Sequence, residues 1–150
     1  MAIRKKTTRK KGRKLINSVK SSHDGIEFDS KLELFMYKRL KEEGIDFTYN
    51  EIKYLLIPSF KYPKDIFEPK KVKEKELVSK TTIRKMEYTP DFVGPNESWI
   101  IETKGRANES FPLRWKMFKH KMLERDEPPV LFLPRNQHEC EQVITILKQL

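Results

Sequence analysis

Two acids and a lysine lie close together at the ends of two segments that otherwise look like strands built for a core. Asp91 lies near the end of the first segment, and Glu102 and Lys104 follow the run "WII" in the second. Side chains two apart on a strand share a face, so Glu102 and Lys104 point the same way, and a hairpin would bring Asp91 beside Glu102. Neighbouring carboxylates repel one another and resist burial. The stability of the fold alone therefore gives no reason to place Asp91, Glu102 and Lys104 together.

A divalent cation would resolve the conflict. Mg²⁺ prefers hard oxygen ligands and keeps part of its water shell, so it suits Asp91, Glu102 and the backbone carbonyl of Thr103. Mn²⁺ is expected to substitute for it. Lys104 would then position a water nucleophile or offset charge that develops at phosphorus, while the metal acts as a Lewis acid. These groups together predict in-line hydrolysis of a phosphodiester.

The alternative interpretation is a surface hairpin with solvated charges. The chain is 36% charged, so a spacing of this kind also arises by chance. The context favours a site, because "WII" leads directly into Glu102 and a helix with its own acid precedes both strands.

Neighbouring elements must hold these charges in place, and the hydrophobic spacing predicts where those elements lie. The pattern is that of an α/β protein with a small mixed central sheet flanked by helices. In the order α-β-β-β-α-β-α, we expect a helix at 30–43, strands at 46–57, 83–93 and 98–104, a helix at 111–125, a strand at 129–134 and a helix at 136–150. The cluster "GPNE" would form the turn between the two acid-bearing strands.

Each helix has recognisable ends and an apolar stripe. Ser30 is a suitable N-cap, Glu33 completes a capping box with it, and Gly44 suits the C-terminal stop. Pro112 fits the first turn of the second helix. The side chains expected to face inward are Leu32, Phe35, Met36 and Leu40 in the first helix, Leu113, Met117, Phe118 and Met122 in the second, and Cys140, Val143, Ile144 and Leu147 in the third; Trp99 and Trp115 are expected in the core.

Length and composition limit the class of protein. A chain of 150 residues is normally one domain. We expect it to occupy residues 26–150, with an insertion at about 58–82 that is rich in Pro, Lys and Glu and resembles an irregular hairpin. No segment approaches a membrane span, and the N-terminus lacks the apolar stretch of a secretory signal. With a single cysteine, Cys140, the chain forms no internal disulfide, so a soluble protein of a reducing compartment such as the cytoplasm is expected.

The positive charge is concentrated in the arm formed by residues 1–25. The whole chain carries +10, and nine Lys or Arg side chains without any acid lie in residues 1–20, which leaves residues 21–150 at +1. Such an arm has little apolar surface, is expected to be flexible, and is typical of segments that bind nucleic acid. The alternative is a solubility tail or a localisation signal. The DNA-contacting residues expected here are Arg4, Lys5, Lys6, Arg9, Lys10, Lys11, Arg13 and Lys14.

The segments "TPDF" and "IIETKG" resemble the motif of the PD-(D/E)-x-K nuclease superfamily, whose core order α-β-β-β-α-β matches the one expected here. The segment "FDSKLELFMYKRLKEEGIDFTYNE", 28–51, is similar to the first helix and strand of the phage endonuclease I family of Holliday-junction resolving enzymes. The segments "GIEFDSKLE" and "FPLRWKMFK" are similar to parts of a group of phage nuclease-like proteins. The matching segments together cover about half of the chain.

The resemblance implies a restriction-endonuclease-like core and a Mg²⁺-dependent endodeoxyribonuclease acting on branched DNA. Asp91, Glu102 and Lys104 match the catalytic positions, and Glu33 matches a helix glutamate that contributes to the metal site. From spacing alone, Glu33 is fully explained as the capping-box partner of Ser30. Residues 58–82 are longer than the corresponding segment of the resembled family, so junction specificity and dimer architecture are not implied.

Several alternatives stay open. The substrate could be linear or flap DNA, or the chain could be an inactive DNA-binding protein on the same fold. A homodimer is possible, and the sequence does not decide whether its elements are exchanged between subunits. The basic residues after the second acid-bearing strand either face DNA or form a solvated helix face; they are Arg106, Arg114, Lys116 and Lys119.

Overall fold

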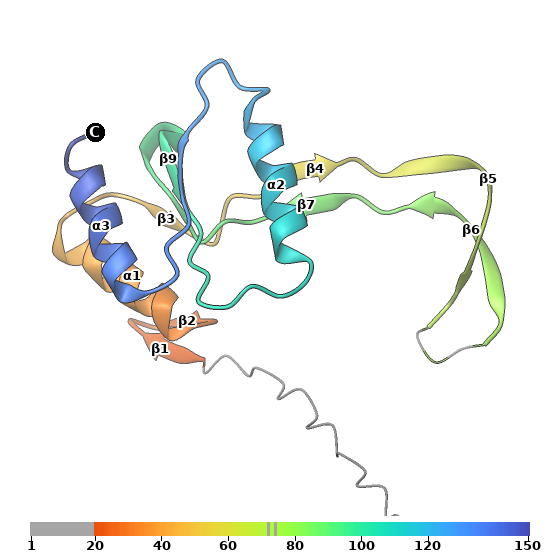
Figure 1. Ribbon diagram of the computed structural model, residues 1–150, viewed down its shortest axis with the longest axis horizontal. Coiled ribbons are helices and arrows are strands. Elements are labelled where there is room, and N and C mark those ends of the chain that lie inside the picture. Colours follow the sequence, from red (N-terminus) through yellow and green to blue (C-terminus); the bar gives the residue numbers. More distant parts are fainter. Residues whose placement is uncertain (1–19, 72, 74) are drawn as a thin grey trace, which may run out of the picture.

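The computed structural model describes residues 20–71, 73 and 75–150, and this part has a mixed α/β architecture with three helices and several small sheets (Figure 1). The DNA contacts expected from Arg4 to Lys14 therefore lie outside the described residues. Within the described ranges, none of the helices combines the length and the apolar character needed to cross a bilayer.

A four-stranded sheet forms the centre of the molecule. Its strand order is β10 (Val130–Phe132), β9 (Trp99–Ile101), β8 (Phe92–Val93) and β3 (Thr48–Tyr49). The β10–β9 pair is parallel, and the other two pairs are antiparallel. Because Ile101 is paired with Phe92 on one side and with Phe132 on the other, strands from distant parts of the sequence meet at the end of β9.

The two faces of this sheet bury two separate hydrophobic clusters. Phe92 and Ile101 belong to a cluster with the helices α1 (Lys31–Glu42) and α3 (Gln137–Leu147). The neighbouring residues Val93 and Ile100 belong to the other cluster, with α2 (Phe111–Met122). This alternation is what a strand buried on both faces requires. The sheet is thus covered by α1 and α3 on one face and by α2 on the other.

The ends of α1 follow the sequence prediction. The Ser30 side chain accepts a hydrogen bond from the Glu33 amide at 3.1 Å. At the other end, Gly44 has a φ of 66°, and the amide of Ile45 donates to the carbonyl of Leu40 at 3.0 Å. This is the Schellman pattern, for which glycine in a left-handed conformation is preferred. The predicted stripe was partly wrong: Tyr37 is buried, while the predicted Leu32 and Phe35 lie at the edge of the core.

The inner face of α2 differs from the prediction. Leu113 was expected to face inward but is 63% exposed, whereas Trp115 is 7% exposed and packs with Phe118 and Met122. The reason is that α2 begins at Phe111, whose side chain is buried, so the stripe continues four residues later at Trp115. In α3 the predicted Cys140, Val143 and Ile144 are all buried.

Both long strands expected before β9 are interrupted. The segment 46–57 splits into β3 and β4 (Tyr54–Ile57) at Asn50, whose φ of 51° cannot continue a strand. The segment 83–93 splits into β7 (Met86–Tyr88) and β8 at Thr89-Pro90, because proline lacks the amide that a ladder needs. The strands β4 and β7 pair with one another in a separate two-stranded sheet.

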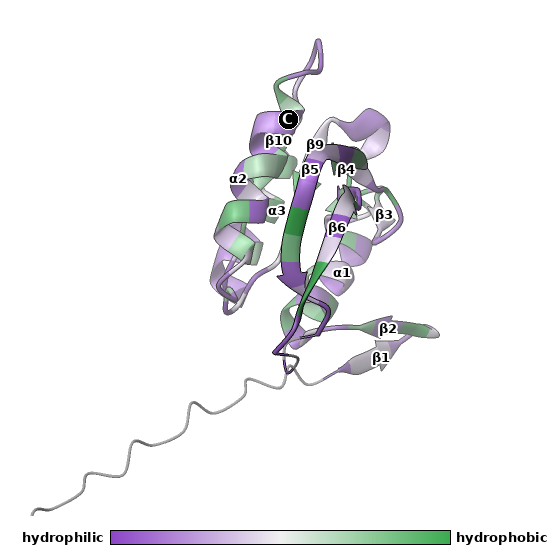
Figure 2. Cartoon of the chain, turned by 90° about the vertical axis from the view of Figure 1, so that its right-hand side faces the viewer, coloured by the Kyte–Doolittle hydropathy of each residue, from purple (hydrophilic) through white to green (hydrophobic). Residues whose placement is uncertain are grey.

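Two hairpins lie outside the central layers. The expected insertion forms a long antiparallel hairpin of β5 (Phe60–Pro69) and β6 (Leu77–Ile83) that extends away from the body (Figure 1). In its colouring by residue hydropathy, hydrophobic segments alternate with hydrophilic ones along this hairpin (Figure 2). A short hairpin of β1 (Ser21–His23) and β2 (Ile26–Phe28) precedes α1. This hairpin includes the strand β1, which lies before residue 26.

Candidate active site

The four residues predicted to be catalytic lie around one pocket. Glu33 comes from the first turn of α1, Asp91 directly precedes β8, and Glu102 and Lys104 follow β9. The pocket has a volume of about 220 Å³. Its remaining lining residues are Asp29, Asn50, Tyr88, Thr89, Asn108, Phe111 and Arg114. The elements α1, β8 and β9 thus supply all four predicted residues to one pocket.

The local structure explains why these side chains meet. The ladder between β9 and β10 continues past the ends of both strands, because the amides of Glu102 and Lys104 donate to the carbonyls of Phe132 and Pro134, each at 3.0 Å. Glu102 and Lys104 therefore keep the alternation of a strand and lie on the α2 side of the sheet, as Ile100 does. The backbone of Asp91 is fixed by its carbonyl, which accepts from the amide of Asn50 at 2.8 Å.

Thr103 orients the Asp91 carboxylate. Asp91 Oδ2 accepts hydrogen bonds from the Thr103 amide at 2.7 Å and from its hydroxyl at 2.6 Å. Thr103 is only 3% exposed, so it is a rigid support for this carboxylate. The sequence pointed to the Thr103 carbonyl as a metal ligand, and that role stays a prediction. The part played by its amide and side chain was not foreseen.

Glu102 has an unsatisfied buried oxygen. Glu102 is only 6% exposed, and its Oε2 has no hydrogen-bond partner among the described residues. The other oxygen, Oε1, lies 3.8 Å from Lys104 Nζ. The Tyr88 hydroxyl is likewise buried without a partner in the described part of the chain. The Tyr88 hydroxyl lies close enough to Glu102 to lower the pKa of that carboxyl in part, although the pair falls outside the geometry of a regular hydrogen bond.

The electrostatics reflect this crowding of acids. Burial raises the pKa of Glu102 to about 6, although Tyr88 and Lys104 act in the opposite direction. The pKa of Asp91 is raised well above its usual range by burial first, and then by the charges of Glu102 and Glu33. Burial and the Glu102 charge also raise the pKa of Tyr88, so its hydroxyl stays a hydrogen-bond donor. The pocket thus favours positive charge or protons.

Glu33 performs the capping role and also borders the pocket. Its Oε1 accepts from the Ser30 hydroxyl at 3.0 Å, and its Oε2 accepts from the Tyr49 hydroxyl at 2.9 Å and from the Asp29 amide at 3.3 Å. Burial, followed by the charge of Glu33, raises the pKa of Tyr49. Both oxygens of Glu33 are therefore already engaged. The tyrosines at 49 and 88 were missed, because a tyrosine in a strand pattern is normally a core residue.

The donor set fits a hydrated divalent ion better than a closed cage. Within the described residues, no three His, Cys, Asp or Glu side chains are grouped closely enough to hold an ion between them. Asp91 and Glu102 form a pair, and Glu102 Oε2 is a buried acceptor that lacks a donor. Mg²⁺ commonly uses one or two carboxylates and keeps several waters. Direct ligation by Glu33 stays a prediction, and its negative charge acts on the pair in either case.

Arg106 and Arg114, both predicted to contact DNA, differ in their position relative to the pocket. Arg114 lines the pocket, where its guanidinium lies 5.7 Å from the centre of the Tyr88 ring and donates to the Glu87 carbonyl at 3.1 Å. Arg106 is exposed and does not line the pocket. DNA contact by either residue stays a prediction.

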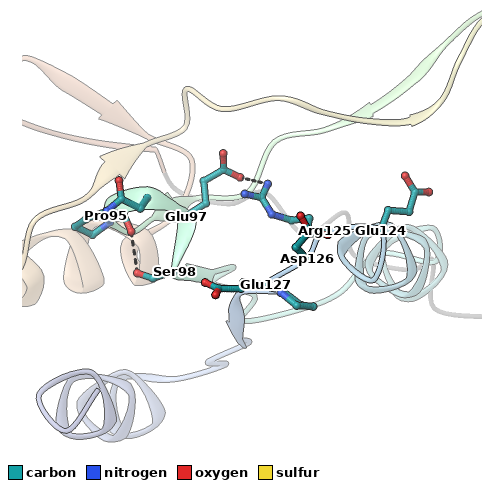
Figure 3. A pocket seen from close by; sticks show the side chains of 9 residues that line it. Pro95, Glu97, Ser98, Glu124, Arg125, Asp126 and Glu127 are labelled. Atoms are coloured by element: carbon teal, nitrogen blue, oxygen red, sulfur yellow. Dashed lines mark hydrogen bonds and ion pairs between the residues drawn. The ribbon is translucent and has the colours of Figure 1, made fainter.

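A larger hollow, of about 1010 Å³, lies elsewhere, between the turn after β8 and the end of α2 (Figure 3). Glu97 bonds Arg125 there at 2.5 Å and accepts from the Tyr54 hydroxyl at 2.8 Å. These groups satisfy one another and tie the two segments together. None of the predicted catalytic residues lines this hollow, so its size does not indicate a reactive site.

Comparison with known families places the chain in one of them. The family model described as "Protein of unknown function (DUF1064)" matches residues 13–128. The chain belongs to the DUF1064 family. The part that matches the DUF1064 model includes the four residues predicted to be catalytic and the helices α1 and α2. It ends before β10 and α3. Searches among curated proteins and among solved structures found no match.

Proposed function

We propose that the chain is a divalent-metal-dependent endodeoxyribonuclease of the PD-(D/E)-x-K type that cleaves branched DNA. The observation that carries this proposal is the pocket itself. Segments far apart in the sequence bring Glu33, Asp91, Glu102 and Lys104 together, and they leave a buried Glu102 oxygen without a donor. A merely structural site would satisfy that oxygen, because an unsatisfied buried acceptor costs about 1–3 kcal/mol.

The element order supports a restriction-endonuclease-like core. A helix is followed by antiparallel strands, then by a second helix that leads to a strand parallel to β9. This is the α-β-β-β-α-β order implied by the resemblance, with its first and second strands each broken in two. Asp91 directly precedes the second of these strands in the central sheet, and Glu102 directly follows the third.

Asp91, Glu102 and Lys104 each have a defined part in the proposed hydrolysis, and Thr103 supports one of them. A divalent ion held by Asp91 and Glu102 would stabilise negative charge on the phosphate. Thr103 keeps Asp91 in one orientation through its two hydrogen bonds. The Lys104 ammonium lies 5.0 Å from the centre of the Phe111 ring, which holds it at the mouth of the pocket.

Lys104 is 33% exposed on its side chain, so it can reach solvent and substrate from that position. There it donates a hydrogen bond to a phosphate oxygen and orients the attacking water. The water oxygen attacks phosphorus in line with the departing sugar oxygen. One proton leaves that water and one joins the departing oxygen, which yields a phosphate monoester and a hydroxyl.

A substrate panel tests the proposal. Four-way junction, flap, nicked and linear duplex DNA of the same sequence should be incubated with the full chain in Mg²⁺, in Mn²⁺ and in EDTA. We expect cleavage that requires the metal and that is fastest on the junction. If the linear duplex were cleaved as fast as the junction, the proposed preference for branched DNA would be wrong. Binding without cleavage of any substrate in either metal would indicate a DNA-binding protein instead.

A further inference from the structure

A second hollow adjoins the candidate active site. It has a volume of about 390 Å³ and shares two of its lining residues, Lys104 and Phe111, with the acidic pocket. Its other lining residues are Gly105, Ala107, Pro112, Trp115, Lys116, Lys119, Leu133 and Arg135. We call it the flanking pocket. The two hollows therefore adjoin one another at Lys104 and Phe111.

The charge of the flanking pocket is opposite to that of its neighbour. Four cationic side chains and no acid line it, whereas four acids line the active-site pocket. Three of these cations, Lys116, Lys119 and Arg135, are exposed and take part in no ion pair with any other residue that the structure describes. Unpaired cations around a concave surface attract a phosphate backbone.

The floor of the flanking pocket is apolar and aromatic. The rings of Phe111 and Trp115 stack with their centres 6.2 Å apart and their planes at 15°. Leu133, Ala107 and Pro112 complete the lining between these rings and the basic rim. Pockets that enclose small organic groups begin at roughly 300 Å³, so a single nucleotide fits this space.

We propose that the flanking pocket binds the nucleotide next to the cleaved phosphate, with its base unpaired and placed on the apolar floor. The phosphate of that nucleotide meets Lys116, Lys119 and Arg135 at the rim. A base inside a duplex is stacked on its neighbours and has no free face, so only an unpaired nucleotide can enter. The inference rests on the proposed function, and it assigns the preference for branched or single-stranded DNA to one named pocket.

Filling the floor tests this site separately from catalysis. Ala107 is exposed at the edge of the pocket, so Ala107→Trp blocks the floor without disturbing the core. Leu113→Trp is the matched control, since Leu113 is 63% exposed on α2 and lines neither pocket. Fluorescence anisotropy in EDTA would measure the affinity of the full chain for a labelled single strand and for a blunt duplex of the same sequence.

We expect the unmodified chain to bind the single strand about tenfold more tightly than the duplex, the size of one base contact. Ala107→Trp should abolish this preference and leave duplex affinity unchanged, while Leu113→Trp should keep it. The inference is overturned if Ala107→Trp retains the preference, or if both variants lose it while their melting temperatures match that of the unmodified chain.

The rim is tested by its salt dependence. Replacing Lys116, Lys119 and Arg135 together by alanine should reduce the slope of log K against log salt for the single strand by about 2. Lys38→Ala, on the exposed side of α1, is the control and should change the slope by less than half as much. An unchanged slope in the triple variant overturns the inference.

Failure of the proposed function would look different. A chain that never cleaves but keeps the single-strand preference and loses it in Ala107→Trp would refute the nuclease and confirm the pocket. Cleavage that is metal-dependent but equally fast on paired and unpaired substrates in both Trp variants would refute the pocket and leave the nuclease standing.

Discussion

Glu102 is the residue on which the proposed chemistry depends most. A buried carboxylate without a donor lowers the stability of the folded chain, because desolvation disfavours its charged form. Its neighbour Asp91 adds repulsion, and Lys104 at 3.8 Å offsets only part of it. The folded chain therefore holds this pair in a state that a cation or a proton would relieve.

The stability of the metal-free chain should depend on pH through this pair. The folded-state pKa of Glu102 is raised by burial to about 6, above its value of 4.5 in an unfolded chain. Between these values the folded chain holds a proton that the unfolded chain releases, so the free energy of unfolding falls as pH rises. We expect Glu102→Gln to be more stable than the unmodified chain above pH 6, by about 2 kcal/mol. Urea denaturation in EDTA, at intervals from about pH 4 to about pH 7, measures this difference.

Comparison with the variant is necessary because other groups titrate in the same range. The pKa of Glu43 is lowered by Lys148 and then by Arg39, so it contributes a slope of opposite sign that both proteins share. Addition of Mg²⁺ near neutral pH should stabilise the unmodified chain and leave Glu102→Gln unaffected. If Glu102→Gln were less stable than the unmodified chain at every pH, the charged Glu102 carboxylate would have favourable partners in the folded chain, and this explanation would be wrong.

At the scale of single residues, the sequence predicts which charged side chains meet in the pocket better than it predicts the residues that support them. Asp91, Glu102 and Lys104 were recognisable because charged residues beside a core strand are costly. Thr103 and Tyr88 gave no such signal, since both are ordinary strand residues. Their importance follows from the β8–β9 pairing, which sets Thr103 against the Asp91 carboxylate.

The turn between β8 and β9 fixes the distance between the two acids. It contains the short 3-10 segment Pro95–Glu97, and the amide of Gly94 donates to the carbonyl of Trp99 at 2.9 Å. The Trp99 ring lies directly against Gly94, so that a Cβ at position 94 would come within 2.3 Å of it. Only glycine allows this packing, because the neighbour is a rigid ring that is 6% exposed.

Gly94→Ala should therefore destabilise the fold and displace Asp91 relative to Glu102. The expected loss is about 3 kcal/mol, at the upper end of overpacking, because Trp99 cannot move without opening its hydrophobic cluster. Gly105→Ala is the control, since a Cβ there would meet only the Arg135 carbonyl at 3.8 Å. Chemical denaturation of both variants measures the difference, and equal stability would show that the turn accommodates a side chain.

At the scale of elements, the helices were predictable and the strands were only partly so. Capping residues and Gly44 marked the limits of α1 because these signals are local. The breaks at Asn50 and at Thr89-Pro90 depend on how the chain leaves one sheet for another, which is not a local property. The inner face of α2 was partly misplaced because its buried first residue, Phe111, was not included, although Trp115 was correctly expected in the core.

For the whole molecule, the long hairpin is an appendage to a compact core. None of the described residues of β5 and β6 belongs to either hydrophobic cluster. Large apolar side chains are nonetheless exposed along it, including Phe67 at 63% and Leu77 at 61%. The strands β4 and β7 connect it to the body by their own antiparallel pairing.

Replacement of residues 58–85 by an Asn-Gly turn between β4 and β7 should leave the core folded. Such a turn suits a two-residue hairpin connection, and the loss should stay below about 1 kcal/mol because no core contact is removed. Thermal unfolding followed by circular dichroism tests this. A shortened chain without a cooperative transition would mean that the hairpin is part of the folding unit.

The central claim is that Asp91, Glu102 and Lys104 form one metal-dependent hydrolytic site. The most direct measurement is the single-turnover rate of junction cleavage in Mg²⁺ for the unmodified chain and for Asp91→Asn, Glu102→Gln and Lys104→Ala, with DNA affinity measured in EDTA. Glu97→Gln is the control, because that acid lies in the large hollow (Figure 3). We predict a loss of at least about 100-fold in each of the three variants, with DNA affinity retained in Asp91→Asn and Glu102→Gln and the control near the unmodified rate. Cleavage by Asp91→Asn or Glu102→Gln at the unmodified rate would contradict the account.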